Sequence, residues 1–425
     1  MKIMRTLART LVAVGAIASA GCDEWLTVPN PTVIDINALD PVTDAPVLAG
    51  SAQQNFAVAY GWLIMYSSWF VGESDVAETF PTRNEFGRRD VVIQNGSHNT
   101  DVWFPLSQAA ASAYLVLNLG DLPEPAKNIN LQRGEVFLGY SYILMAEMFC
   151  TGTVLSGPEL TTLNMLDSAV AHFTKAIDIG TANGTTDAVA LANAARVGRA
   201  RAHLQAGRKS QAAADAASVP AGFNFNLNYA DDLANRTRLG NRLWQFIADR
   251  GSIAVSPIWR VTDPRVPQRV APSNLLPQDA NYTVDRGVPY VIQNKYPTFN
   301  APIRLASKME ADYIAAEAGG DATMLALIQA RRAANGQPPY NGGTTGTALM
   351  TEFMTQRGLE FYLEGKRLGD FRRADGAGQG AAVIGMPVPG STYWKPGFAP
   401  VGAQKCWLLP TPEIDNNPNL SRGGN

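Results

Sequence analysis

The stretch MTQRGLEFYLEGKRLGDFRRAD, from Met354 to Asp375, is the most informative part of the chain. Four charged residues recur in it at intervals of three, four and three: Arg357, Glu360, Glu364 and Arg367. Opposite charges at these spacings attract each other on a helix surface, and the intervals place all four side chains on one face. The pattern therefore predicts a single helix over 349–373, with an apolar stripe formed by Met354, Phe361 and Leu368.

Two of these residues, Glu360 and Glu364, raise the possibility of catalysis. Glycoside hydrolysis uses a pair of carboxyl groups about 5 to 10 Å apart. An arginine beside each carboxylate would lower its pKa, however, whereas a general acid needs a raised pKa. We therefore interpret the charges as structural.

This segment resembles the C-terminal signature of the SusD/RagB family of outer-membrane nutrient-binding lipoproteins, roughly E-R-x-x-E-L-x-x-E-G-x-R-x-x-D-L-x-R. Gln356 stands where the pattern begins with Glu. The matching signature positions are Arg357, Glu360, Glu364, Gly365, Arg367, Asp370 and Arg373. The chain's end, WLLPTPEIDNNPNL over 407–420, is similar to the family's closing motif, and a helix predicted over 303–318 resembles its A-E-x-Y-L run.

The N-terminus has the layout of an export signal. Lys2, Arg5 and Arg9 precede an apolar run over 11–20 that is too short to span a bilayer permanently. Cys22 follows directly, and the pattern resembles the lipobox of bacterial lipoproteins, which implies a lipid anchor on Cys22. The alternative is a soluble secreted protein cut after Ala20 or Gly21. The Pro-rich residues 22–33 then read as a tether.

Composition narrows the class of protein further. With 46% hydrophobic residues the chain is globular. The 35 basic residues fall to 32 when Lys2, Arg5 and Arg9 leave with the signal, against 37 acidic residues, for a net charge of about −5. We expect no nucleic-acid partner, because such binding needs a basic face. Cys150 and Cys406 can pair in an oxidising compartment, but we predict two buried thiols.

Helical periodicity dominates the rest of the chain. Further helices are predicted over 44–70, 104–119, 133–149, 161–179, 188–205, 211–217 and 322–334. Within 131–220, small and aromatic residues such as Gly139 and Phe173 stand at tetratricopeptide-like positions, which favours stacked helix pairs over an ordinary bundle. The predicted fold is mostly α: a tetratricopeptide-like, SusD-like scaffold with loop-rich, short-strand insertions, forming a single domain over 34–425 after the signal (1–21) and the tether (22–33).

The segment 221–300 lacks a sustained period and is predicted to be a ligand-facing insertion, followed by the signature region 301–425. Sugar recognition needs flat aromatic faces with polar neighbours. Trp259, Tyr282 and Tyr296 rank first, because they lie in the stretch with the least helical period. The other candidates are Trp69, Trp103, Tyr290, Trp394, Asn281, Asp285, Arg286 and Asn294. Most such aromatics in a chain of this kind are packing residues.

Metal and cofactor signals are weak. The histidines His98, His172 and His203 lack partners at metal-ligand spacing, so we expect no metal and no cofactor. Acidic loops such as 279–285 could coordinate calcium, although no EF-hand spacing is present.

The resemblance implies a surface-exposed lipoprotein of the outer membrane that is not an enzyme. It would bind oligosaccharides, or peptides as RagB-like receptors do, and deliver them to a SusC-like TonB-dependent transporter. A periplasm-facing repeat scaffold for envelope assembly shares the anchor and the helix pairs and remains an alternative. A glycan hydrolase is a further rival, which turnover of a labelled oligosaccharide would reveal.

Overall fold

The computed structural model describes residues 39–420. The described residues from Pro41 onward form one compact unit. The predicted signal, Cys22, the tether and the boundary at residue 34 all lie outside the described residues. Within them, no helix combines the length and the apolar character that a membrane span requires.

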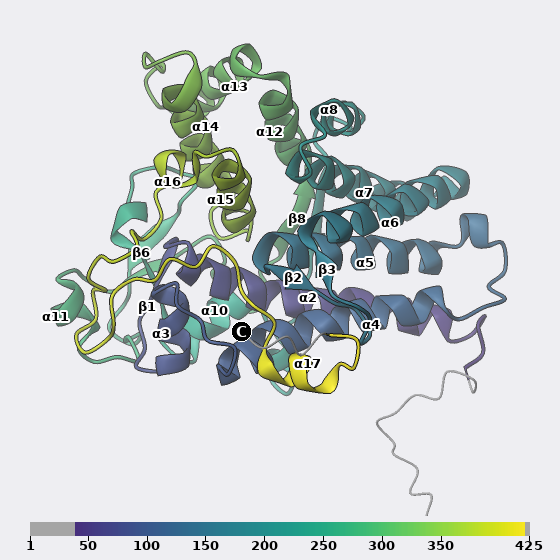
Figure 1. Cartoon of the computed structure of the whole chain (residues 1–425), viewed down its shortest axis with the longest axis horizontal. Helices are drawn as coiled ribbons and strands as arrows, with labels where there is room; N and C mark the ends of the chain where they lie inside the picture. The colour runs from purple at the N-terminus through teal and green to yellow at the C-terminus, as the bar shows by residue number, and fades with distance from the viewer. Residues whose placement is uncertain (1–38, 421–425) are drawn as a thin grey trace, which may run out of the picture. The chain divides into compact units, whose positions relative to one another are not determined.

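The scaffold is a series of helices in which each packs against the next (Figure 1). It begins with the long α2 (Ala45–Phe70), which packs on α4 (Phe104–Leu117) and α5 (Ile129–Met148). It continues through α6 (Thr162–Asn183), α7 (Thr186–Gln205) and α8 (Lys209–Ala217) to α12 (Lys308–Gly319) and α13 (Asp321–Ala334). The predicted mostly helical fold with short strands is confirmed.

The helix pairs pack closely because small residues face an aromatic ring. Phe173 on α6 is fully buried and lies against Gly139 of α5 and Gly198 of α7. A Cβ added at Gly139 would come within 2.8 Å of the Phe173 ring. Local signals delimit the same helices: Asn128 caps α5, and the Thr161 side chain forms a capping box with Asn164 at the start of α6.

The irregular segment holds short antiparallel strand pairs. β1 (Ser74–Val76) pairs with β5 (Ile253–Val255), and β6 (Gln268–Val270) pairs with β7 (Val291–Gln293). A third pair, β2 (Thr151–Gly152) with β3 (Leu160–Thr161), lies between α5 and α6. Short helical segments complete the described chain: α3 (Pro81–Gly87), η2 (His98–Trp103), η3 (Pro125–Lys127), α9 (Arg236–Leu239), α10 (Arg242–Ala248), η4 (Pro257–Trp259), α11 (Tyr282–Arg286), α16 (Gly380–Val383) and α17 (Thr411–Asn416).

The helix predicted over 303–318 begins later than expected. Ile303–Ser307 form strand β8, which pairs antiparallel with β4 (Asn224–Leu227), and α12 starts only at Lys308. Ser307 supplies the N-cap, since its hydroxyl accepts a hydrogen bond from the Glu310 amide. Strand pairing across more than 75 residues overrides the local helical pattern here, as tertiary contacts commonly do.

The single helix predicted over 349–373 is wrong. α14 (Gly346–Glu360) ends at Glu360, a turn occupies 361–366, and α15 (Arg367–Gly376) follows. The turn has left-handed backbone at Leu363 (φ 54°) and Gly365 (φ 66°), and a Cβ at Gly365 would lie 3.1 Å from the Ile64 side chain. The four charged residues of the opening motif therefore do not share one helical face.

The two cysteines form a disulfide, so the prediction of buried thiols is wrong. Cys150, at the end of α5, is bonded to Cys406 across 256 residues of sequence. Two backbone hydrogen bonds reinforce the link. The Cys150 amide donates to the Trp407 carbonyl oxygen at 2.8 Å, and the Trp407 amide donates to the Met148 carbonyl oxygen at 2.8 Å. The bond attaches the chain's end to the scaffold, where Trp407 is fully buried.

Candidate functional site

All but one of the charged signature residues form buried ion pairs, and the exception is Arg367. The Glu364 carboxylate is 1% exposed and accepts hydrogen bonds from Lys295 Nζ at 2.7 Å and Arg304 Nη2 at 2.8 Å. Burial acts to raise the pKa of Glu364, but the neighbouring positive charges outweigh it and hold the pKa below its usual value. A general acid needs the opposite shift, so this carboxyl serves structure.

Glu360 belongs to a separate group of charges. Its carboxylate pairs with Arg331 Nη2 at 2.9 Å, while the Arg304 guanidinium also reaches the Glu360 carbonyl oxygen. Arg357, Asp370 and Arg373 form a third group on α14 and α15, in which both arginines donate to the Asp370 carboxylate. The signature thus joins elements that are far apart in sequence.

Most of the aromatic candidates lie inside the protein. The exposed fractions of Tyr282, Trp103, Tyr296 and Trp259 are 0%, 3%, 4% and 5%. The Tyr282 hydroxyl donates to Asp75, and the Trp103 ring nitrogen donates to Glu413 Oε2 at 3.0 Å. Little of these four rings is exposed to solvent, although Trp259 and Tyr296 reach the lining of two other pockets.

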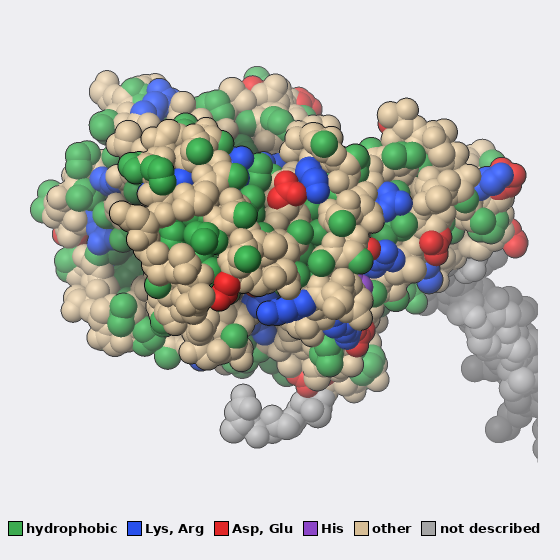
Figure 2. Space-filling view, turned by 90° about the horizontal axis from the view of Figure 1, so that it is seen from above, with side chains coloured by type: hydrophobic (Ala, Val, Ile, Leu, Met, Phe, Trp, Pro, Cys, Tyr) green, Lys and Arg blue, Asp and Glu red, His purple; other side chains and the backbone are tan. Residues whose placement is uncertain are grey.

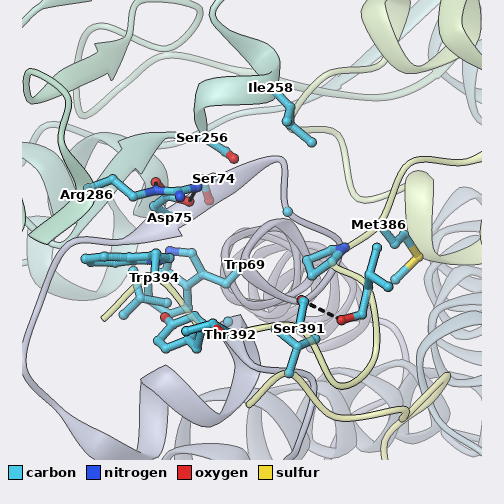
Figure 3. A pocket seen from close by; sticks show the side chains of 17 residues that line it. Trp69, Ser74, Asp75, Ser256, Ile258, Arg286, Met386, Ser391, Thr392 and Trp394 are labelled. Carbon is cyan, nitrogen blue, oxygen red and sulfur yellow. Dashed lines mark hydrogen bonds and ion pairs between the residues drawn. The ribbon is translucent and has the colours of Figure 1, made fainter. Parts of the chain in front are cut away.

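The structure does bring together other candidates around one pocket, with a cavity volume of about 250 Å³ (Figure 3). Trp69 at the end of α2, Arg286 at the end of α11 and Trp394 in the C-terminal loop all line it. Trp394 and Arg286 lie on one side and Ile258 and Met386 on the other. The remaining polar lining comes from Ser74, Asp75, Ser256, Ser391 and Thr392.

Charge pairing orients the polar side of this pocket. Arg286 Nε donates to Asp75 Oδ2 at 2.9 Å, and the Tyr282 hydroxyl donates to the same oxygen at 3.1 Å. The Arg286 guanidinium also lies 5.6 Å from the centre of the Trp394 ring. Asp75 is buried on strand β1, so it holds Arg286 beside a half-buried indole.

A flat indole beside a fixed guanidinium and several hydroxyls suits a sugar. The apolar face of a pyranose packs on an aromatic ring, and its hydroxyls exchange hydrogen bonds with charged and hydroxyl side chains. Ile258 and Val388 are 61% and 65% exposed on the pocket's lining, so apolar surface continues beyond the indole. The arrangement offers binding groups and holds no nucleophile–base pair.

Sequence reasoning named part of this pocket and missed the rest. Arg286, Trp69 and Trp394 were candidates, whereas Asp75 and the serines were not. Asn281, Asp285 and Asn294 are not among the lining residues, although α11 carries both Asp285 and Arg286. An acidic residue on a short strand directly after the longest helix was the available signal for Asp75.

Calcium is not favoured at the predicted loop. Asp279 is buried and its carboxylate pairs with Lys395 Nζ at 2.6 Å. Within residues 39–420, no three or more acidic, histidine or cysteine side chains cluster as metal ligands would.

Acidic and basic side chains are interspersed on the molecular surface seen in Figure 2, which presents no broad area of one charge sign.

No protein-family model matches the chain, and no curated protein matches it in sequence. Solved structures do match its fold. A SusD superfamily protein from Parabacteroides distasonis superposes with a TM-score of 0.62 at 14% identity, covering 90% of this chain and 99% of its own. The chain therefore has the fold of the SusD/RagB superfamily.

Two further similar structures carry names that refer to glycans. A laminarin-binding SusD-like protein matches with a TM-score of 0.60 at 15% identity, over 89% of this chain and 98% of its own. The surface glycan-binding protein A from Bacteroides uniformis matches with a TM-score of 0.60 at 14% identity, over 87% and 98%.

Proposed function

We propose that the protein is a non-catalytic glycan receptor, anchored to the outer membrane by lipid on Cys22, that faces the cell exterior and passes oligosaccharides to a SusC-like TonB-dependent transporter. The observation that carries the proposal is the pocket in which Trp394 lies beside the Arg286–Asp75 ion pair. The fold and the glycan-binding names of two similar structures support the same class of ligand.

The export signal and Cys22 supply the location. A single acyl chain holds a protein to a bilayer only weakly, whereas several chains on one cysteine hold it firmly. Cys22→Ser is expected to abolish incorporation of labelled palmitate and to release the protein from the membrane fraction. Protease treatment of intact cells then distinguishes the receptor from a periplasm-facing scaffold, because only a surface protein is digested. Co-purification with a TonB-dependent transporter tests the partner.

The binding experiment begins with an oligosaccharide array, followed by titration calorimetry with the strongest binder. Trp394→Ala removes the indole face and is expected to weaken binding by about tenfold or more, since stacked aromatics are common anchors in binding sites. Trp244→Ala is the matched control, because Trp244 is a half-buried tryptophan on α10 outside this pocket. Equal affinities for the two variants, or an array with no bound glycan, would contradict the proposal.

A further inference from the structure

A second pocket adjoins the first. Its cavity volume is about 390 Å³, and Ile258 lines both pockets. The neighbours Gly385 and Met386 also face one pocket each, Gly385 the second and Met386 the first. A ligand made of linked units can therefore reach from one pocket to the other across Ile258.

Arg367 is the basic residue that lines this second pocket. Its guanidinium lies 4.8 Å from the centre of the Trp259 ring, and its Nη2 donates to the Gly385 carbonyl oxygen at 3.2 Å. Within residues 39–420 it forms no salt bridge, and neither Nε nor Nη1 makes a hydrogen bond. The other signature arginines, Arg357 and Arg373, both pair with Asp370.

The acidic groups nearby leave this positive charge poorly compensated. Asp263, which also lines the pocket, is already engaged at both oxygens by Arg265, at 2.9 Å each. Glu73, whose charge acts on Arg367, is 1% exposed and does not line the pocket. Burial raises the pKa of Glu73 to about 7, against the opposing charges of Arg367 and Lys295, so Glu73 is only partly ionised at neutral pH.

Arg367 itself stays protonated. Burial lowers its pKa from the usual value of 12.5, and the nearby acids Glu73 and Asp370 act in the opposite direction. Arginine remains charged in proteins. A half-buried guanidinium whose Nε is buried without a hydrogen-bond partner and that has no ionic partner is costly, and an anion that fills the pocket reduces that cost.

We propose that this pocket is a subsite for an acidic sugar unit, one that bears a carboxylate or a sulfate ester, recognised by Arg367 while a neighbouring unit stacks on Trp394. The inference rests on the proposed function and narrows its ligand to acidic oligosaccharides. The exposed hydroxyls of Thr262 and Thr355 and the side chain of Gln337 line the same pocket and can bond the unit's hydroxyls.

The test compares neutral, uronate-bearing and sulfated oligosaccharides on one array, followed by calorimetry of the best binder and of its neutral counterpart. The expected best binder is acidic, and its neutral counterpart binds at least tenfold more weakly to the unaltered protein. This comparison needs no variant, so it holds even if a substitution disturbs folding. The uronate and sulfate arms identify which anion the pocket takes.

Arg367→Gln is expected to weaken binding of the acidic probe by about 10- to 100-fold, the loss of a hydrogen bond to a charged group. It should leave binding of the neutral counterpart unchanged within twofold. Arg269→Gln is the matched control, because Arg269 is exposed on β6 and lines neither pocket.

Two results would overturn the inference. One is a best binder that is neutral. The other is an acidic binder whose affinity is insensitive to Arg367→Gln but is lost in Trp394→Ala. If Trp394→Ala still weakens glycan binding, either result leaves the proposed glycan receptor standing and removes only the acidic subsite.

Discussion

Replacing Asp370 by Asn is expected to destabilise the fold by about 2 to 5 kcal/mol at pH 7. The Asp370 carboxylate is buried and accepts hydrogen bonds from Arg357 Nε at 2.7 Å and Arg373 Nη2 at 3.0 Å. Arg373 retains Glu317 as a partner in the variant, but Arg357, only 2% exposed, loses the acid with which it pairs. Leaving one buried charge unpaired costs roughly 3 to 5 kcal/mol.

The shifted pKa of Asp370 gives a second, lower value for the free energy by which this ion pair stabilises the fold. Burial acts to raise its pKa, but the charges of Arg357 and Arg373 outweigh burial and lower the pKa from 3.8 to about 2. A shift of that size corresponds to about 2 kcal/mol. Because the folded-state pKa is depressed, this stability is fully present above pH 4 and is lost as the pH falls toward 2.

The assay is urea unfolding of both proteins at pH 7 and pH 3. The difference in unfolding free energy should be about 1 kcal/mol smaller at pH 3, since the wild-type carboxyl is then partly protonated in the unfolded state.

Asp312→Asn provides the matched control. Asp312 is 40% exposed and pairs with Lys308 on the surface of α12, where such pairs contribute about 0.5 kcal/mol. A loss below about 1 kcal/mol for Asp370→Asn at pH 7, or a loss that does not change with pH, would refute the reasoning.

Two further predictions concern stability. Burial raises the pKa of Glu73 to about 7, so the wild-type protein loses stability as the pH rises from 4.5 to 7. The Glu73→Gln protein should therefore be about 3 kcal/mol more stable than the wild type at pH 8 and equally stable at pH 4. The same difference in stability at both pH values would argue against this reasoning. The Cys150→Ser/Cys406→Ser protein should lose about 2 to 5 kcal/mol, because the bond closes a long loop. Dithiothreitol should lower the Tm of the wild type and leave that of the double variant unchanged; no effect on the wild type would contradict the disulfide.

The helical scaffold was predictable because its signals are local. Apolar residues at intervals of three and four, and small residues opposite Phe173, depend only on neighbouring turns of helix. The predicted helices over 44–70, 104–119 and 188–205 match α2, α4 and α7 closely. The signature motif also identified the fold, since several motifs in the right order are specific.

The signature's geometry could not be predicted in the same way. Its charges fit an uninterrupted helix by spacing, but the turn at 361–366 is stabilised by partners from distant parts of the chain. The Tyr60 hydroxyl donates to the Glu364 carbonyl oxygen at 2.8 Å, and Lys295 donates to that of Tyr362 at 2.8 Å. The interval pattern contains no information about these contacts.

The binding pocket depends still more on tertiary structure. The absence of helical periodicity over 221–300 correctly predicted loops in that segment. It did not reveal that Trp259, Tyr282 and Tyr296 are buried there. The pocket unites Asp75, Arg286 and Trp394, which are more than 100 residues apart along the chain. The sequence alone therefore determined most of the helices and the fold class, because short-range periodicity and motifs encode them, and it predicts the anchor. Which side chains meet, which cysteines pair and which indole remains accessible depended on long-range packing, which only the three-dimensional structure contains.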